Sequence, residues 1–94
     1  MIAMRELDAL TIIAIQIYYK TQLSRLIRDW GTNPNSYRKF IKVLAQAISH
    51  HFPRFKDLMD EAITAVDKCQ SIDCMIKVCS QVFEESGGIL DICP

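Results

Sequence analysis

Apolar residues recur along this chain at helical spacing, and the pattern predicts a protein built from α-helices. In the segment 34–51 the apolar residues follow one another at intervals of three and four positions and fall on one stripe. This stripe consists of Tyr37, Phe40, Ile41, Leu44 and Ile48. Pro34 suits the first turn of such a helix, and Pro53 blocks its continuation because the residue before a proline is pushed out of the α region. We therefore predict an amphipathic helix over 34–51.

The remaining pattern raises the prediction to about five helices. Residues 5–20 keep helical spacing at five apolar positions, although the isoleucines there leave a strand as the alternative. These positions are Leu7, Leu10, Ile13, Ile17 and Tyr18. Residues 22–30 give a second, short helix, followed by a glycine that can take the positive φ of a tight helix exit. Helices over 54–69 and from Ser71, a capping residue, to Gly87 complete an all-α fold.

The length and composition indicate one compact domain over residues 1–94. A chain of 94 residues can bury a single core, but it is too short for a core and a deep substrate cleft. Half of the residues are apolar, and only three glycines and three prolines occur. The longest apolar run, residues 10–19, is interrupted by Thr11 and Gln16 and reaches about half of the ~20 residues that a membrane span needs. We therefore expect a soluble, cytoplasmic protein with no membrane partner.

The charges are unevenly distributed although the net charge is zero. Residues 20–56 contain eight basic residues and a single acid, Asp29, whereas residues 57–94 contain eight acids and two lysines. One half of the chain could therefore meet an anionic polymer that the other half would repel. The alternative is that these charges only cover solvated faces of helices.

The segment GTNPNSYRKFI, residues 31–41, resembles the turn and recognition helix of helix-turn-helix repressors. The shared pattern is glycine, any residue, Ser/Asn, Pro, Ser/Asn, Ser/Thr, an apolar residue, two polar residues and two apolar residues. With the preceding helix, the resemblance covers about residues 22–44, a quarter of the chain. It implies a small transcriptional regulator that binds double-stranded DNA, sequence-specifically or generally, through a basic recognition helix. Residues 1–52 would be the tri-helical, helix-turn-helix-like part and residues 53–94 an acidic helical part.

Within this resemblance each residue takes a role from its position. Trp30, Tyr37 and Phe40 stand where the family places packing residues, whereas Ser36 and Arg38 stand where it places residues that face DNA. The polar face of the helix 34–51 lies about 150° from its apolar stripe at 100° per residue. The predicted DNA-binding residues are Lys20, Arg25, Arg28, Asn33, Asn35, Ser36, Arg38, Lys39 and Lys42.

The predicted contacts divide into two kinds. Lys20, Arg25 and Arg28 would neutralise phosphates and set the register on the duplex. The residues of the helix 34–51 would face base edges or the flanking backbone, where Arg38 could pair with guanine and Asn35 with adenine. For each residue the alternative is a solvated side chain on a helix surface.

The two C-terminal helices are predicted to pack on the first three and to join two subunits. Their apolar stripes are wide for one small domain, so we expect a homodimer through residues 55–90 with Val82 and Phe83 as contacts. The stripes are Phe55, Leu58, Met59, Ala62, Val66 and Cys69 in the first, and Ile72, Met75, Ile76, Cys79, Val82 and Phe83 in the second.

A protein-binding helical module is the alternative to DNA binding. Such a module, for example a small viral or plasmid regulator, would capture a host protein through its acidic helices. It would show an exposed apolar groove along the two C-terminal helices and no exposed basic stripe on the helix 34–51.

All four cysteines, Cys69, Cys74, Cys79 and Cys93, lie in the last quarter of the chain. Their spacing is not a zinc signature, and on helical segments the first three sulfurs point in different directions unless the break near Ser71 folds them together. We favour buried free thiols, because cysteines on apolar faces commonly serve as small core residues. A Cys69–Cys74 or Cys79–Cys93 disulfide is the alternative and would indicate an oxidising compartment or a hyperthermophile's cytosol.

No pattern in the chain indicates catalysis, a bound metal or a cofactor. A nucleophile elbow and a glycine-rich phosphate loop are both missing from the sequence. His50 and His51 are better explained by a favourable position at the negative end of a helix than by metal ligation. We therefore expect a binding protein and not an enzyme.

Overall fold

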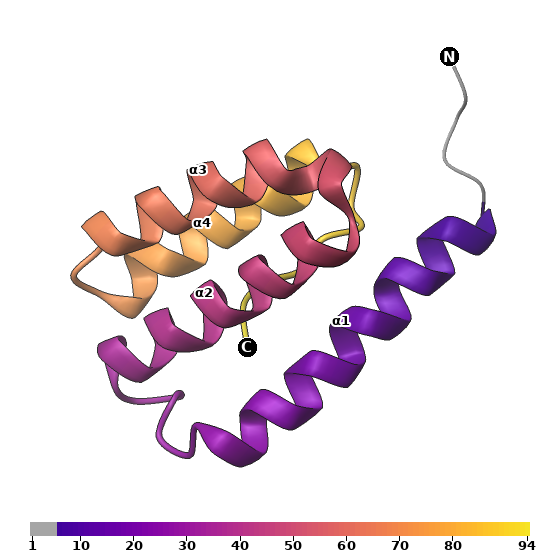
Figure 1. The fold of residues 1–94 in the computed structure, drawn as a ribbon. Helices are drawn as coiled ribbons and strands as arrows, with labels where there is room; N and C mark the ends of the chain where they lie inside the picture. Colours follow the sequence, from indigo (N-terminus) through magenta and orange to yellow (C-terminus); the bar gives the residue numbers. More distant parts are fainter. Residues whose placement is uncertain (1–5) are drawn as a thin grey trace.

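The computed structural model describes residues 6–94, with side chains from residue 8 onward, and it is all-α over this range (Figure 1). Its helices are α1 (Glu6–Leu26), α2 (Pro34–His51), α3 (Lys56–Lys68) and α4 (Ile72–Glu85), with a short 3₁₀ turn, η1 (Pro53–Phe55), before α3. The chain ends in a non-helical C-terminal segment, residues 86–94. Residue 5 and the Leu7 side chain, which belong to the predicted first helix, lie outside the described part.

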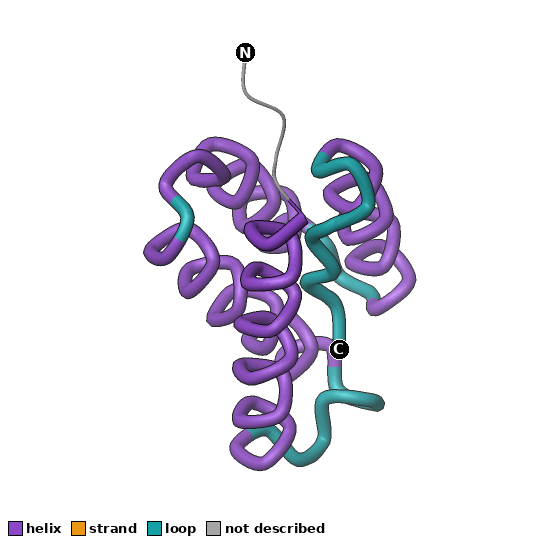
Figure 2. Tube along the Cα trace, turned by 90° about the vertical axis from the view of Figure 1, so that its right-hand side faces the viewer, coloured by secondary structure: helices purple, strands orange, loops and turns teal. Residues whose placement is uncertain are grey.

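Helix α2 is the centre of the fold. It packs against α3 on one side and α1 on the other and also contacts α4, whereas α1 has no other helix as a close backbone neighbour (Figure 1). The predicted apolar stripe of α2 is confirmed, since all five of its residues are buried. In Figure 2 the C-terminal segment runs as a loop beside α1. Helix α1 is therefore held by α2 and by the end of the chain.

The prediction of five helices is wrong, because the first two predicted helices are one. Helix α1 continues through Lys20 and Thr21 to Leu26, and residues 27–33 form the turn to α2. Lysine is a good helix former, and the Thr21 hydroxyl donates a hydrogen bond to the Ile17 carbonyl, 2.8 Å away, within the helix itself. The separate second helix of the predicted tri-helical arrangement is therefore not confirmed.

Helix α1 buries a different face from the one that the sequence suggested. The side chains that face the rest of the protein are Ile12, Gln16, Leu23 and Ile27. Leu10, Ile13, Ile17 and Tyr18, which keep equally good helical spacing, are exposed. Although α1 is long and rich in isoleucine, none of the helices in the described range is both long and apolar enough to cross a membrane.

One buried polar side chain, Gln16, fastens the C-terminal segment to α1. Its Nε2 donates to the carbonyl oxygen of Ile89, 2.9 Å away, and to that of Ile12 at 3.3 Å. Its Oε1 accepts the backbone N–H of Asp91 at 2.7 Å. The amide of Gln16 thus satisfies backbone groups that burial would otherwise leave unpaired.

The stripes of α3 and α4 are largely covered within one chain. Their buried residues are Met59, Ala62, Val66, Met75, Cys79 and Val82. Because Val82 is buried, it is not available as the predicted dimer contact, whereas Phe83 is exposed. Gly87 follows α4 with φ of 73°, as the sequence predicted for a glycine at this helix end.

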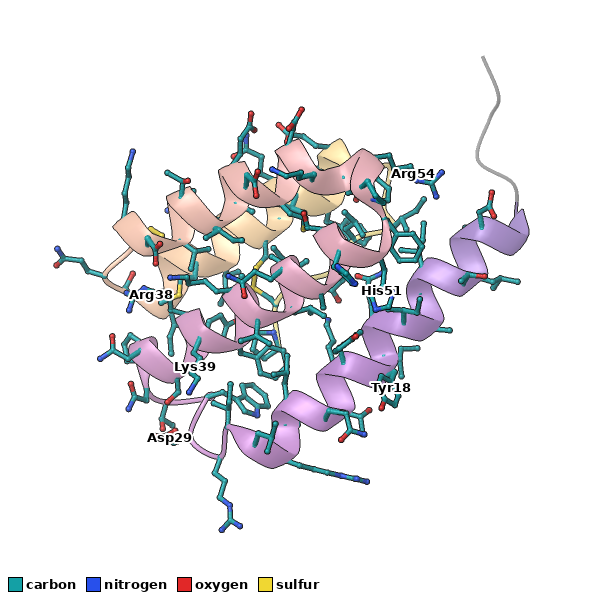
Figure 3. The ribbon with its side chains drawn as sticks, in the orientation of Figure 1. Tyr18, Asp29, Arg38, Lys39, His51 and Arg54 are labelled. Carbon is teal, nitrogen blue, oxygen red and sulfur yellow. A yellow bond between two sulfur atoms is a disulfide. The ribbon has the colours of Figure 1, made fainter. Side chains whose placement is uncertain are left out.

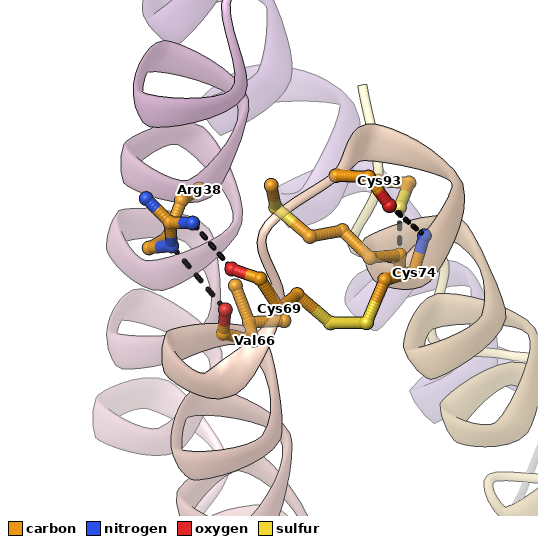
Figure 4. The surroundings of a disulfide bond; sticks show 7 residues. Arg38, Val66, Cys69, Cys74 and Cys93 are labelled. Atoms are coloured by element: carbon orange, nitrogen blue, oxygen red, sulfur yellow. Dashed lines mark hydrogen bonds between the residues drawn. A yellow bond between two sulfur atoms is a disulfide. The ribbon is translucent and has the colours of Figure 1, made fainter.

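Both cysteine pairs form disulfides, so the preference for free thiols is wrong. Cys69 is joined to Cys74 (Figure 4), and Cys79 is joined to Cys93. The sulfurs were expected to diverge unless the break near Ser71 folds them together, and this break is present, since α3 ends at Lys68 and α4 begins at Ile72. This break brings the Cα atoms of Cys69 and Cys74 to 5.5 Å, and the returning C-terminal segment brings those of Cys79 and Cys93 to 5.8 Å.

Candidate nucleic-acid interface and apolar face of α1

The turn before α2 is built from side chains that the sequence assigned to DNA. Asn33 caps α2, since its Oδ1 accepts the backbone N–H groups of Asn35 at 2.9 Å and Ser36 at 3.4 Å. The Asn33 amide also donates to Asp29 at 3.1 Å, and the Ser36 hydroxyl donates to the other oxygen of Asp29 at 2.7 Å. Asn33 and Ser36 therefore stabilise the entry into α2.

The same hydrogen bonds set the ionisation of Asp29. The Ser36 hydroxyl first, and the Asn33 amide second, lower the pKa of the Asp29 carboxyl below its ordinary value. The network therefore contributes stability near neutral pH, and this contribution is lost as the pH falls through the lowered pKa. Asp29 also places a negative charge at the start of α2, where it bonds Asn33 and Ser36, and this charge disfavours a phosphate there.

Arg38, the predicted guanine-binding residue, is occupied by the end of α3 (Figure 4). Its Nε donates to the Val66 carbonyl at 3.3 Å, and one terminal nitrogen donates to the Cys69 carbonyl at 2.6 Å. The other terminal nitrogen donates to Oδ1 of Asn35 at 2.7 Å. The guanidinium thus caps the carboxyl end of α3, where unpaired carbonyl groups favour a cation.

Two of the predicted lysines are ion-paired within the chain. Lys42 contacts Asp67 of α3 at 2.9 Å, and Lys20 contacts Asp91 of the C-terminal segment at 3.2 Å. Six of the nine predicted DNA-binding residues therefore have polar partners in the protein, Asn35 included. Exposed ion pairs are weak, so the two lysines could still exchange their partners for a phosphate.

Three predicted cations remain without a polar partner in the described range: Arg25, Arg28 and Lys39. All three are exposed, at the end of α1, in the turn and on the outer face of α2. Figure 3 shows Lys39 on α2, in the same part of the helix as Arg38. A shallow groove beside it is lined by Asn35, Arg38, Lys39, Lys42, Val43 and Gln46. The structure thus has a small cationic surface around the turn between α1 and α2 and the first half of α2, and not a continuous basic stripe.

The exposed residues of α1 form the most continuous apolar surface of the described part. Leu10, Ile13, Ile17 and Tyr18 are 57%, 40%, 60% and 61% exposed. Together with Ala14 and Thr21, also exposed, they occupy positions i, i+3, i+4, i+7, i+8 and i+11 on one side of the helix. We call these six residues the apolar face of α1. The helical spacing of these residues is visible in the sequence, but nothing in the sequence indicates that they face solvent and not the core.

A second apolar surface is a groove between α3 and α4. Its floor is Leu58, Ala62, Ala65, Val78 and Val82, and its rim carries Glu61, Gln81 and Glu85. The alanines keep this groove close to the helix backbones, and Glu85 accepts a hydrogen bond from Gln81 at 3.2 Å. An apolar groove along these helices was the expected mark of a protein-binding module.

Comparison with protein families, curated proteins and solved structures found no match. A function can therefore be inferred only from the exposed surfaces of this chain described above.

The described residues gather no metal-binding cluster. No group of three or more His, Cys, Asp or Glu side chains lies in a position to hold an ion within this range. His51 faces α1, where its Nε2 lies 2.9 Å from the Tyr19 hydroxyl (Figure 3). This contact links the end of α2 to the middle of α1, next to the exposed ring of Tyr18, with which Tyr19 packs edge to face.

Proposed function

We propose that this protein is a disulfide-stabilised helical module that binds another polypeptide through the apolar face of α1. The observation that carries the proposal is the row of four large apolar side chains, exposed along one helix at helical spacing. Scattered apolar residues are normal on a protein surface, but a contiguous row of them is typical of an interaction site. A groove or a second helix would fit such a row, as in helix-mediated recognition.

Polypeptide binding is favoured over sequence-specific DNA binding because the polar residues predicted to contact bases make hydrogen bonds within the protein. Arg38, Ser36 and Asn33, the centre of the predicted recognition surface, hold the protein together. Base readout needs side chains that are free to enter the groove. The two disulfides also argue against an intracellular DNA-binding role. Such bonds persist in oxidising compartments and are rare in the cytosol, where we expected the protein from its sequence.

A selection from a library of helical peptides tests the proposed function. Peptides that bind the protein should lose at least tenfold in affinity when Ile17 is replaced by serine, because an exposed anchor at the centre of the contact carries much of the binding energy. Ile76→Ser is the matched control, since Ile76 is an exposed isoleucine on α4 and its loss should leave binding unchanged. Binders that are equally sensitive to both changes, or only to Ile76→Ser, would contradict the proposal.

Nucleic-acid binding is the second candidate, supported by the three cations that have no partner. Arg25, Arg28 and Lys39 could contact phosphates without reading bases, which gives weak and salt-dependent binding. In a gel shift with duplex DNA over 50 to 200 mM salt, replacing all three by alanine should flatten the slope of log K against log salt by about 0.9 for each lost contact.

The matched control for the gel shift replaces Arg54, Lys68 and Lys77 by alanine, which removes the same charge from other exposed positions. Loss of DNA binding in the first variant only would support this candidate. Equal loss in both variants would indicate an effect of net charge, and absence of a shift at 50 mM salt would exclude this candidate.

A further inference from the structure

We infer that the partner of the apolar face of α1 is a second copy of this chain, packed antiparallel to the first about a two-fold axis. The inference rests on the proposed function, because it assumes that this face is an interaction surface. It differs from the dimer expected from the sequence, which placed the contact on α3 and α4.

The first argument is that the face is complementary to itself when reversed. A two-fold interface brings the same patch of both subunits together, so an antiparallel pair must match each position with its mirror position along the helix. About a centre between Ala14 and Ile17, these two residues face each other, as do Ile13 and Tyr18, and Leu10 and Thr21. In the central pair Ala14 faces the larger Ile17, and in the outer pair Thr21 faces the larger Leu10. Such small-to-large pairing lets the two helices interdigitate.

Thr21 is compatible with this packing although it is polar. Its hydroxyl already donates to the Ile17 carbonyl within α1, so burial at an interface would leave no unpaired donor. Asp8 and Arg25 lie beyond the two ends of the face, and the one described charge within its length, Lys20, is not part of it and is paired with Asp91. The face can therefore be dehydrated without burying a charge.

The second argument is the distribution of charge along α1. Among its described side chains, the acid Asp8 lies near the start and Arg25 near the end, and Arg28 follows the helix. Lys20 is paired with Asp91, and Asp29 accepts hydrogen bonds from Asn33 and Ser36, so among the described charges at this end Arg25 and Arg28 are unpaired. A parallel pair would bring the basic ends of two copies together. An antiparallel pair brings each basic end toward the acidic end of the partner, and opposite charges select this orientation.

The third argument is that the fold leaves this side of α1 open. Among the described helices, α2 alone lies beside α1 (Figure 1). The side chains that α1 buries, Ile12, Gln16 and Leu23, do not belong to the apolar face. With 21 residues, α1 is about 31 Å long, which is sufficient for three turns of contact on each copy at the usual rise per residue. The distance between two packed helices, about 8–10 Å, can thus be reached without moving another element.

Sedimentation equilibrium of the full, oxidised chain from 10 to 500 µM tests the inference. The protein should approach twice its 10.8 kDa monomer mass within this range, and Ile17→Asp should weaken the association at least tenfold. Ile76→Asp on α4 should dimerise like the parent. Circular dichroism of both variants confirms that the fold is retained, and Ile17→Ser provides a milder variant should Ile17→Asp disturb it.

Orientation is tested by isotope-filtered NMR on a mixture of labelled and unlabelled protein. The inference expects intermolecular contacts between the Ile13 methyl groups and the Tyr18 ring, and between Leu10 and Thr21. A monomer throughout the range, contacts between identical ends of α1, or a dimer broken only by Ile76→Asp would overturn it. If the protein stays monomeric while selected peptides still bind in an Ile17-dependent manner, the proposed function stands and the self-association alone is wrong.

Discussion

Reduction of both disulfides is expected to lower the free energy of unfolding by about 5 kcal/mol. In the chain-entropy description, a bridge limits the freedom of the unfolded chain in proportion to the logarithm of the loop that it closes. The Cys69–Cys74 pair, five residues apart, should contribute about 2 kcal/mol, and the Cys79–Cys93 pair, fourteen apart, about 3 kcal/mol. This sum is comparable with the whole stability of many small domains, commonly about 5–15 kcal/mol.

Urea unfolding with and without reductant measures the change, and two double variants divide it. Cys69→Ala with Cys74→Ala should lose about 2 kcal/mol and Cys79→Ala with Cys93→Ala about 3 kcal/mol. Alanine leaves no polar group in these buried sites, so the loss reports the bridges more than a new defect. Four free thiols in the unfolded, unreduced protein would contradict both bridges, as would a midpoint that does not change on reduction.

Replacing Arg38 by methionine is expected to cost about 2–3 kcal/mol of stability, the next largest effect. Methionine keeps the apolar stem but removes the charge-assisted hydrogen bonds to the Val66 and Cys69 carbonyls. Hydrogen bonds that involve a charged group contribute about 1.5–3 kcal/mol each, and partial exposure of Arg38 reduces the total. The Cys69 carbonyl loses its partner at the same time, at the point where α3 ends.

Lys39→Met is the matched control, since Lys39 is the next residue on α2, is exposed and has no polar partner in the described range. Its unfolding free energy should stay within about 0.5 kcal/mol of the parent. Equal stability of the two variants, measured by thermal and urea unfolding, would show that Arg38 does not fasten α3 to α2. A loss of DNA binding in an Arg38 variant would have to be corrected for this destabilisation before it could report a base contact.

The helices whose faces were predicted correctly have one apolar stripe each. In α2, α3 and α4 the apolar residues cluster on one side, and that side faces the core except at Ile76 and Phe83 of α4, which are exposed. Helix α1 has two apolar faces. Ile12 and Leu23, with Ile27 just after the helix, compete for the core with Leu10, Ile13 and Ile17. Local spacing cannot decide between two apolar faces, since the outcome depends on where α2 and the C-terminal segment lie. The exposed face of α1 therefore had to come from the structure.

The partners that most candidate DNA residues have within the protein could not be predicted from the sequence, for a related reason. The carbonyl partners of Arg38 and the acidic partners of Lys42 and Lys20 lie 25 to 71 positions further along the chain, and no local pattern predicts them. Asn33 is different, because an asparagine directly before a proline at the start of an apolar stripe is a common helix N-cap. That signal was present in the sequence and could have separated a structural residue from a DNA-binding one.

The bonds of Gln16 to residues 89 and 91 also constrain the order of folding during synthesis. Helix α1 leaves the ribosome first, yet the backbone groups that satisfy its buried amide are made about seventy residues later. Until then α1 can associate with α2 but keeps an unpaired polar group on its inner side. The nascent chain should therefore remain open on this side until residues 89–91 emerge, and only then close in a single cooperative step.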